Sequence, residues 1–575
     1  MPDSPALPTA SNPTFPAPPT PTPPSPASAA ATALLTGLIQ AGLTDLVLAP
    51  GSRSQALALA AAALERAGSL QLHVRIDERV AGFTALGLAQ ETGRPVAVAV
   101  TSGTAVAELH PAVLEAHHAG VPLLLLTADR PAELHGIGAN QTTVQAGMFA
   151  AAVRAEFDVA APGTPADALA ATQLADRAFA VALGSASTAP GPVHLNLAYR
   201  EPLSGVAPAV ELQPTPVAGS DPADVLPIEP GPRTVVVAGD KAGERAEAFA
   251  RDAGVPLLAE VSSGARFGPM VVGAYRPLLD DPELGGRIER VVVFGHPTLS
   301  RQVPALLAGA EVEVVLVGPA GGEWFDPTDG RALRTGAVRA TAPSPDRTWL
   351  GAWITASRGL LADSDDPPYR PPADDASPRE RGAHARAELA AVRAPVTRRA
   401  LVEAVWRATW PHDRLVFGAS RLIREADAVV PGKRIRVVSN RGLAGIDGTI
   451  STAIGVALGA ARSGRGGRTR VLLGDLTLLH DAGALLATPG EPVPRLQVIV
   501  GNDGGGTIFD SLEVAATAPP DDFRRVLTTP RPADLSALAA AYGWSYRRVT
   551  TRGELDAALI TPAPGRELVE VPLPA

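Results

Sequence analysis

Two stretches decide the fold: VLLGD at residues 471–475 and LQVIVGN at residues 496–502. Each is an apolar strand that ends in a polar turn, and an Ala- and Leu-rich stretch of helical character lies between them. Strands that are joined through a helix run parallel in one sheet. Their carboxyl ends then lie at one edge of the sheet, which is where such sheets bind ligands. We therefore expect Asp475 and Asn502 to arrive together at that edge.

Asp475 and Asn502 would each offer a hard oxygen atom at this edge. A small cation such as Mg²⁺ prefers oxygen ligands, and a diphosphate would complete its coordination. The glycines at 504–506 would let the backbone approach the anion closely. Gly-Asp and Asn-Gly pairs also mark many ordinary turns, so a plain double turn is the alternative. The segment predicts a site for a metal ion and a diphosphate.

Composition narrows the class of protein. The chain has 575 residues, of which 46% are hydrophobic, and this is enough for about three or four domains with buried cores. A formal net charge of -9 argues against nucleic acid as a bulk partner. The absence of cysteine excludes disulfides, iron–sulfur clusters, zinc thiolate sites and a cysteine nucleophile. Neither a signal peptide nor a membrane span is recognisable, so the sequence predicts a cytoplasmic protein without a membrane partner.

Strand and helix patterns alternate along most of the chain. This alternation predicts an α/β fold of three sequential domains, each built on a doubly wound parallel sheet. The predicted divisions are a disordered Pro-rich tail (1–30), a first domain (31–205), a linker (206–232), a central domain (233–360), a second linker (361–392) and a third domain (393–575). The central domain lacks a complete Gly-x-Gly-x-x-Gly, so no bound nucleotide is expected there.

Two turns of the first domain carry polar residues directly after a predicted strand. The turn PGSRS at 50–54 leads into a helix, where free backbone N–H groups favour an anion. A helix cap made by Ser52 or Ser54 is the alternative. Glu78 follows another strand and could reach a bound heterocycle, whereas a cap or a surface ion pair with Arg79 is the usual explanation of such a residue.

With these motifs in view, the chain resembles the thiamine-diphosphate enzymes of menaquinone biosynthesis, the 2-succinyl-5-enolpyruvyl-6-hydroxy-3-cyclohexene-1-carboxylate (SEPHCHC) synthases. The matching segments are APGSRS (49–54), DER (77–79), TSGTA (101–105), TADRP (127–131), GANQ (138–141), SNRG (439–442), GIDG (445–448), GD (474–475) and Asn502. They occur in the family's order and span nearly the whole chain beyond the tail. The resemblance implies a pyrimidine-binding first domain and a diphosphate-binding third domain.

The resemblance implies thiamine diphosphate as the cofactor, with Mg²⁺, or alternatively Mn²⁺, as the metal ion. The residues that match the family's cofactor contacts are Glu78, Ile446, Gly474, Asp475, Leu476, Asn502 and Gly504, and the metal ligands among them are Asp475, Asn502 and the Gly504 carbonyl. Glu78 matches the glutamate that bonds the aminopyrimidine ring and promotes the proton relay to the thiazolium carbon. Ile446 matches a bulky residue beneath the bent cofactor, and core packing would suit it equally.

The family's reaction decarboxylates 2-oxoglutarate and adds the resulting succinyl carbanion to isochorismate, which gives SEPHCHC and CO₂. Substrates with several carboxylates need fixed guanidinium groups. The residues that match the family's substrate contacts are Ser52, Arg53, Arg130, Asn140, Gln141, Arg301, Ser420, Arg424, Arg441, Ile508, Phe509 and Leu512. Ser52 and Arg53 are also expected in catalysis beside Glu78. For any one of the arginines, a solvated surface charge is the alternative.

The glycine-rich segment departs from the family pattern at two positions. Thr507 stands between the last glycine and Ile508, and Asp503 replaces a more usual Asn. The extra residue could shift the matches at Ile508, Phe509 and Leu512 by one position. Asp503 would add negative charge near the diphosphate, so its side chain is expected to point away.

The resemblance also concerns assembly and regulation. Glu78 and Asp475 would serve one cofactor from two subunits, which implies at least a homodimer and suggests a homotetramer. Arg276 and Arg301 are candidates for a basic pocket that binds a downstream product in some relatives. No catalytic role is assigned to His117, His118 or His480.

Two other functions stay open at this stage. The first is another thiamine-diphosphate decarboxylase or carboligase with a different donor or acceptor, although an enzyme for a simpler 2-oxo acid would need fewer arginines. The second is a non-catalytic relative that only binds the cofactor. The presence of Glu78, Asp475 and Asn502 speaks against the second.

Overall fold

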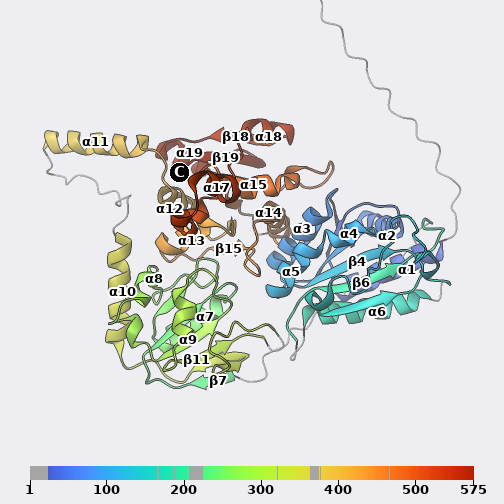
Figure 1. The fold of residues 1–575 in the computed structure, drawn as a ribbon, viewed down its shortest axis with the longest axis horizontal. Helices are drawn as coiled ribbons and strands as arrows, with labels where there is room; N and C mark the ends of the chain where they lie inside the picture. The colour runs from blue at the N-terminus through green and yellow to red at the C-terminus, as the bar shows by residue number, and fades with distance from the viewer. Residues whose placement is uncertain are drawn as a thin grey trace, which may run out of the picture.

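The structure is a computed structural model that describes residues 24–164, 167–184, 188–205, 225–319, 322–362, 375, 377–464 and 466–574. These residues form three α/β domains, and every sheet is parallel (Figure 1). The predicted fold class is confirmed. None of the helices in the described ranges is long and apolar enough to cross a membrane.

The first domain is built on a six-stranded sheet in the order β2-β1-β3-β4-β6-β5. Its inner strand β3 is fully buried, and successive residues enter opposite core clusters: Val98 packs on one face and Ala99 on the other. A strand that is apolar on both faces requires helices on both sides of the sheet. Its elements are α1 (Pro26–Ala41), β1 (Asp45–Leu48), α2 (Gln55–Arg66), β2 (Gln71–Val74), α3 (Glu78–Thr92), β3 (Val96–Val100), α4 (Thr104–Ala107), α5 (His110–His118), β4 (Leu123–Asp129), β5 (Ala155–Val159), α6 (Asp167–Leu183) and β6 (Val193–Ala198).

The third domain repeats this topology. Its sheet has the order β15-β14-β16-β17-β19-β18. When the strands are numbered from the start of each domain, both sheets have the order 2-1-3-4-6-5. Its elements are α12 (Arg398–Ala408), β14 (Arg414–Phe417), α13 (Arg421–Val429), β15 (Arg436–Ser439), α14 (Thr449–Arg462), β16 (Thr469–Gly474), α15 (Asp475–His480), β17 (Leu496–Asn502), α16 (Val514–Thr517), α17 (Pro520–Phe523), α18 (Leu535–Ala541), β18 (Ser545–Arg548), α19 (Arg552–Ile560) and β19 (Arg566–Pro572).

The central domain has a five-stranded sheet in the order β12-β11-β10-β8-β9 and a separate pair, β13-β7. Its elements are β7 (Val225–Ile228), β8 (Thr234–Ala238), α7 (Glu244–Ala253), β9 (Leu257–Ala259), α8 (Tyr275–Leu279), β10 (Arg290–Phe294), α9 (Gln302–Ala308), β11 (Glu313–Val317), β12 (Leu333–Thr335), β13 (Ala337–Ala340) and α10 (Arg347–Ala362).

Regular elements occur in the segments predicted as tail and first linker. Helix α1 begins at Pro26, so it overlaps the tail predicted for 1–30, whose residues 1–23 lie outside the described ranges. Ser25 caps this helix by accepting a hydrogen bond from the Ser28 N–H group. Strand β7 falls in the linker predicted for 206–232 and pairs in register with β13. A four-residue strand that needs a distant partner leaves little local signal.

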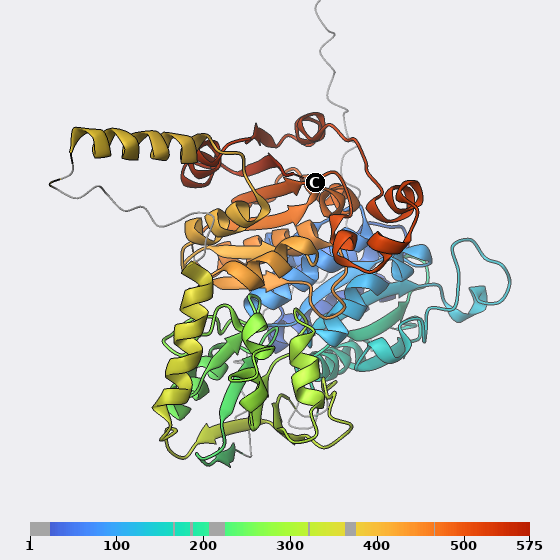
Figure 2. The ribbon, with the colours of Figure 1, turned by 60° about the vertical axis from the view of Figure 1, so that its left-hand side comes forward.

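Helix α11 (Pro378–Arg393) falls inside the second predicted linker, 361–392. Ser377 and Glu380 form a capping box at its start, and Pro378 occupies the first turn. The helix buries none of its residues and extends away from the body of the molecule (Figure 2). The proline and charged residues of this segment are typical of a linker, but its capping sequence correctly predicts the start of a helix.

Helices α3 and α14 join the first domain to the third. They cross at glycines: a Cβ atom on Gly87 would lie 2.0 Å from the Thr452 carbonyl oxygen, and one on Gly455 would lie 2.1 Å from that of Thr84. Side chains of both helices belong to a single core cluster. Because α3 begins at Glu78, this crossing sets the position of Glu78 against the third domain.

Candidate active site

The ends of β16 and β17 bring the two predicted metal-binding side chains together. Gly474 and Gly501 are paired across these strands, and Asp475 and Asn502 follow them directly. Asp475 is 4% exposed. Neither of its carboxylate oxygens has a hydrogen-bond partner in the described ranges. The predicted meeting of the two strand ends is therefore present.

The surroundings of Asp475 suit a cation. Burial, followed by the negative charge of Asp503, raises the pKa of Asp475 to about 6. The nearby backbone N–H groups of Leu476, Asp475 and Gly505, which form no regular hydrogen bond with the carboxylate, offset only part of this rise. A buried carboxylate costs free energy unless a proton or a cation compensates its charge. A divalent cation would supply that compensation.

Asn502 is oriented by the neighbouring strand. Its Nδ2 donates to Glu570 Oε1 on β19 at 2.8 Å, so its Oδ1 faces the glycine-rich turn and accepts only a 3.3 Å bond from the Gly504 N–H group. Tyr546 donates to the other oxygen of Glu570. Gly504 has φ of 77°, a conformation that favours glycine. The carboxylate, the amide oxygen and the open turn fit a metal ion that carries a diphosphate.

Asp503, the residue that departs from the family pattern, is held by the protein. Its Oδ2 accepts from Arg398 Nη2 at 3.1 Å and from the Thr507 hydroxyl at 2.5 Å. Thr507, the inserted residue, thus stabilises the unusual aspartate. The ion pair with Arg398 offsets part of the negative charge that Asp503 adds beside Asp475.

Glu78 is the first residue of α3, and Asp77 caps the helix by accepting from the Arg79 N–H group at 2.9 Å. Glu78 is half-buried, and burial raises its pKa, with the charges of Asp77 and Glu108 adding to the effect. The start of α3 adjoins the end of α15, because Arg79 Nη2 donates to the His480 carbonyl at 3.1 Å.

Two arginines predicted to bind substrate adjoin each other in the first domain. Arg53 and Arg130 are both buried, and the charge of Arg53, after burial, lowers the pKa of Arg130. Arg53 Nη1 donates to the Tyr199 carbonyl at 3.1 Å. Arg53 Nε and Arg130 Nη1 are buried without a hydrogen-bond partner in the described ranges. Two adjacent guanidinium groups with unused donors suit a carboxylate.

The polar residues of the first domain divide into two kinds. Ser52 and Asn140 are exposed. Gln141 has φ of 53°, and its side chain donates to the Ser102 carbonyl at 2.8 Å, while the Ser102 hydroxyl donates to the Gln141 carbonyl at 3.1 Å. Gln141 is exposed as well. All three side chains can therefore reach a ligand, and that of Gln141 is held in place by the Ser102 segment.

The third domain carries a second group of arginines. Arg441 is buried and donates through Nε to the Thr298 hydroxyl at 2.9 Å and through Nη2 to the Thr298 carbonyl at 3.1 Å. Its Nη1 has no hydrogen-bond partner in the described ranges. Burial, and then the charges of Arg441 and Arg276, lower the pKa of Arg424, whose Nη1 donates to the Ser420 carbonyl at 2.9 Å. Thr298 belongs to the central domain, so two domains shape this group.

The two arginines proposed for a regulatory pocket differ. Arg276 Nη2 forms a 2.6 Å ion pair with buried Asp427, so this guanidinium group already has a carboxylate partner. Arg301 is exposed and precedes α9, and no ion pair is found for it in the described ranges. Arg301 is the freer of the two for a ligand.

The apolar residues predicted near cofactor and substrate are partly covered. Ile446, Leu476, Ile508 and Phe509 are half-buried, and Leu512 is 38% exposed. Ile508 and Phe509 lie on the short 3₁₀ turn that follows the glycines. In one chain, this turn presents apolar surface that a ligand or a second copy would cover.

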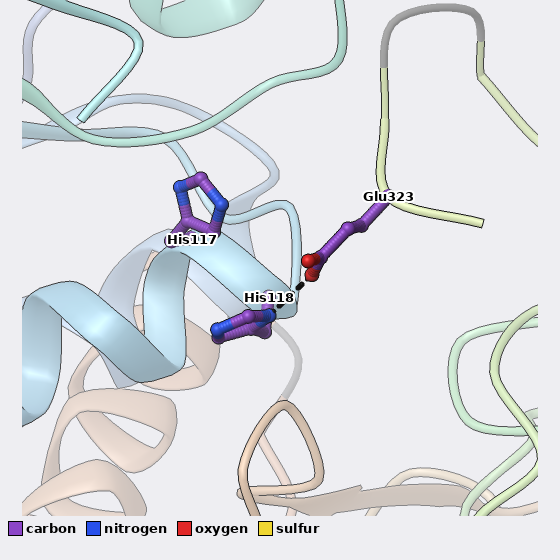
Figure 3. A group of neighbouring side chains, drawn as sticks. All are labelled: His117, His118 and Glu323. Carbon is purple, nitrogen blue, oxygen red and sulfur yellow. Dashed lines mark hydrogen bonds and ion pairs between the residues drawn. The ribbon is translucent and has the colours of Figure 1, made fainter. Parts of the chain in front are cut away.

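His117, His118 and Glu323 form a cluster of potential metal ligands at the boundary of the first and central domains (Figure 3). His118 Nδ1 pairs with Glu323 Oε2 at 2.5 Å. His117 is already occupied: Arg154 Nη1 lies 3.0 Å from its Nδ1, and the ring also bonds the Ala152 backbone. A cation there would meet the Arg154 guanidinium, so we read the cluster as a contact between domains.

Comparison with known proteins identifies the family. Residues 29–150 match the family described as "Thiamine pyrophosphate enzyme, N-terminal TPP binding domain". The chain is 58% identical over 567 residues to a 2-succinyl-5-enolpyruvyl-6-hydroxy-3-cyclohexene-1-carboxylate synthase of Leifsonia xyli subsp. xyli (strain CTCB07). This alignment covers 94% of this chain and 96% of the relative. The chain belongs to the SEPHCHC synthase family.

A second SEPHCHC synthase, from Clavibacter michiganensis subsp. michiganensis (strain NCPPB 382), is 54% identical over 591 residues, covering 98% of this chain and 99% of the relative. Benzoylformate decarboxylase from Polynucleobacter necessarius has a similar structure, with a TM-score of 0.64 and 17% identity over 95% of this chain and 98% of that chain. At this identity the likeness concerns the fold alone.

Sequence reasoning missed several residues that support the site in this SEPHCHC synthase family member. Buried Glu115 accepts from the Gly442 and Leu443 N–H groups at 2.7 and 2.8 Å and so ties the Arg441 segment to the first domain. Asp481 accepts from the Ser451 N–H group at 2.8 Å. Other supporting residues are Arg398, Glu570 and Gln145. Their partners are far away in sequence, so no local pattern marks them.

Proposed function

We propose that this chain catalyses the SEPHCHC synthase reaction, in which 2-oxoglutarate loses CO₂ and its succinyl unit is added to isochorismate. The observation that carries the proposal is Asp475, a buried carboxylate that makes no regular hydrogen bond within the described ranges. It lies beside the Asn502 oxygen in a chain of this family. We also propose that the enzyme acts in the cytoplasm, as the sequence predicts.

Thiamine diphosphate with Mg²⁺, or alternatively Mn²⁺, is the proposed cofactor. Asp475, Asn502 and the Gly504 carbonyl would hold the metal ion, and Gly474 and Leu476 would contact the cofactor beside them. When bound, the cofactor supplies the electron sink for decarboxylation and for carbon–carbon bond formation. Asp475 would bind the metal ion in its charged form, which its buried position otherwise disfavours.

Glu78 is the proposed proton-handling group. Because burial raises its pKa, this carboxyl group holds its proton closer to neutral pH than an exposed glutamate does. It can therefore share that proton with a ring nitrogen of the cofactor. Ile446, half-buried at the start of the loop before α14, would support the cofactor from below.

The arginines divide between the two substrates. Ile508 and Phe509, expected against the succinyl group, belong to the third domain, as do Arg424 and Ser420. We therefore assign this group to 2-oxoglutarate. We assign the first-domain group to isochorismate; it consists of Arg53, Arg130, Ser52, Asn140 and Gln141. Arg301 and Arg441 would contact isochorismate from the central and third domains.

We propose that the working unit is a homodimer at least, and a homotetramer is the expected assembly. In such an assembly, Glu78 of one copy and Asp475 of another would serve one cofactor. Apolar side chains that would be covered by a second copy include Ile508, Phe509 and Leu512.

The test is release of ¹³CO₂ from 1-¹³C-labelled 2-oxoglutarate, with and without isochorismate, in the presence of thiamine diphosphate and Mg²⁺. We expect release coupled to an adduct that carries the succinyl group, detected by mass spectrometry. Release without an adduct would point to another acceptor. No release from a chain that binds the cofactor would favour a different donor or a non-catalytic relative.

A further inference from the structure

Gln145 is a buried amide that bonds three separate segments of the first domain. It is 1% exposed. Its Oε1 accepts from the Gly103 N–H group at 2.9 Å, and its Nε2 donates to Asn196 Oδ1 at 2.9 Å and to the Ala128 carbonyl at 3.2 Å. Both N–H groups of the amide are used, so the side chain has one defined orientation.

The first of these segments is the turn at 101–104, which contacts two of the proposed isochorismate residues. The Thr101 hydroxyl accepts from the Arg53 backbone N–H group at 3.3 Å. Ser102 exchanges two hydrogen bonds with Gln141, as described above. By holding Gly103, Gln145 therefore acts on Arg53 and Gln141 together.

The other two segments lead to Arg130. Asn196 Nδ2 donates to Asp129 at 3.0 Å and to Asp158 at 2.8 Å, and Asp129 Oδ1 accepts from the Arg130 backbone N–H group at 2.7 Å. Because its Nδ2 has two carboxylate acceptors, Asn196 cannot turn its amide over to suit a changed partner. Ala128 lies on the same strand, two residues before Arg130.

We propose that Gln145 is a positioning residue for isochorismate binding, which holds Arg53, Arg130 and Gln141 in one arrangement. It does not itself touch the substrate, because it is buried and its amide is bonded to Gly103, Ala128 and Asn196. The segment between Gln141 and Gln145 is pinned at both ends, to the Ser102 turn and to β4 and β6. The inference deepens the proposed function and rests on its assignment of these residues to isochorismate.

Two variants separate the bonds that Gln145 makes. Gln145→Met approximates the shape and removes all three hydrogen bonds. Gln145→Glu keeps an acceptor for Gly103 but places an oxygen against the oxygens of Asn196 and Ala128. With the full chain loaded with thiamine diphosphate and Mg²⁺, we expect the KM for isochorismate to rise about 10- to 100-fold, because small misplacements of binding groups have effects of that order. The KM for 2-oxoglutarate and the cofactor affinity should stay near wild-type values.

Gln497→Met is the matched control. Gln497 is also fully buried, and its Nε2 donates to the Ala558 carbonyl and to Glu567, at the end of β17 remote from Asn502. This variant should lose stability without a selective rise in the KM for isochorismate. If the two Gln145 variants raise the KM for isochorismate and the KM for 2-oxoglutarate equally, Gln145 has only a structural role and the proposal is overturned.

Hydrogen exchange of the amides at 136–149, without substrates, gives a second readout that does not depend on the reaction. Exchange should be faster in Gln145→Met than in the wild type and in Gln497→Met, and unchanged exchange would overturn the proposal. If Gln145→Met does not fold, Gln145→Glu carries both measurements. A wild-type chain that forms no adduct with isochorismate would refute the proposed function, and the exchange data would still decide whether Gln145 holds this loop.

Discussion

At the scale of single residues, Glu78 offers the most direct test of the chemistry. Glu78→Gln keeps the size of the side chain and its place at the start of α3 but removes the titrating proton. We expect the variant to bind thiamine diphosphate, measured by calorimetry, and to lose about 10²- to 10⁴-fold in CO₂ release. Glu388→Gln, an exposed glutamate on α11, is the control. Unchanged turnover in Glu78→Gln would remove the proton-handling role.

Glu260 gives a prediction about pH and stability. Its Oε1 accepts from the Thr298 and Leu299 N–H groups at 2.7 Å each, and burial, with the charge of Asp427, raises its pKa to about 8 from 4.5. The folded protein keeps this proton up to about pH 8, whereas the unfolded chain releases it near pH 4.5. This group therefore lowers the free energy of unfolding progressively as the pH rises between those values.

Glu260→Gln removes that pH dependence and keeps an acceptor for both N–H groups. We expect the difference in Tm, variant minus wild type, to increase from pH 5 to pH 8 and then to level off. Thermal unfolding followed by circular dichroism across this range makes the measurement. A difference that does not vary with pH would show that Glu260 is ionised in the folded protein.

At the scale of elements, the crossing of α3 and α14 depends on the absence of side chains at two glycines. Gly87→Ala would place a Cβ atom against the Thr452 carbonyl, and backbone cannot yield as a flexible side chain can. We expect a loss of about 1–3 kcal/mol in the free energy of unfolding, measured by denaturant titration.

The control for this prediction is Gly359→Ala on α10. A Cβ atom there meets no heavy atom within 4 Å, so alanine should stabilise the helix by about 0.4–1 kcal/mol through the unfolded state. An equal gain in stability in both variants would mean that helix propensity, and not the close approach, determines the result.

At the scale of the whole molecule, the proposed sharing of the site between two copies predicts complementation. Glu78→Gln and Asp475→Ala chains should each be inactive alone. After mixing under conditions that exchange subunits, half of the dimers would be mixed, and each mixed dimer would have one intact site of two, so about a quarter of the wild-type activity should return. No recovery, with mixed dimers demonstrated by mass, would place both residues in one site of a single chain.

The sequence by itself determined the three parallel α/β domains and the placing of Asp475 and Asn502 at adjacent strand ends. These features follow from local patterns, because apolar runs of strand length, separated by helical stretches and ended by polar turns, permit little else. It also named Glu78, Arg53, Arg130 and Arg441, since each stands in a recognisable motif.

Only the tertiary structure decided which of these side chains have unused hydrogen-bonding atoms and what holds the others in place. Arg276 forms an ion pair with Asp427, Arg398 forms one with Asp503, and Gln145 joins three segments; in each case the partners come from separate stretches of chain. Helix α11 and strand β7 were also missed, the first because its composition resembles a linker and the second because its pairing partner lies in β13. Burial and hydrogen bonding depend on how distant segments pack, and a one-dimensional pattern does not contain that information.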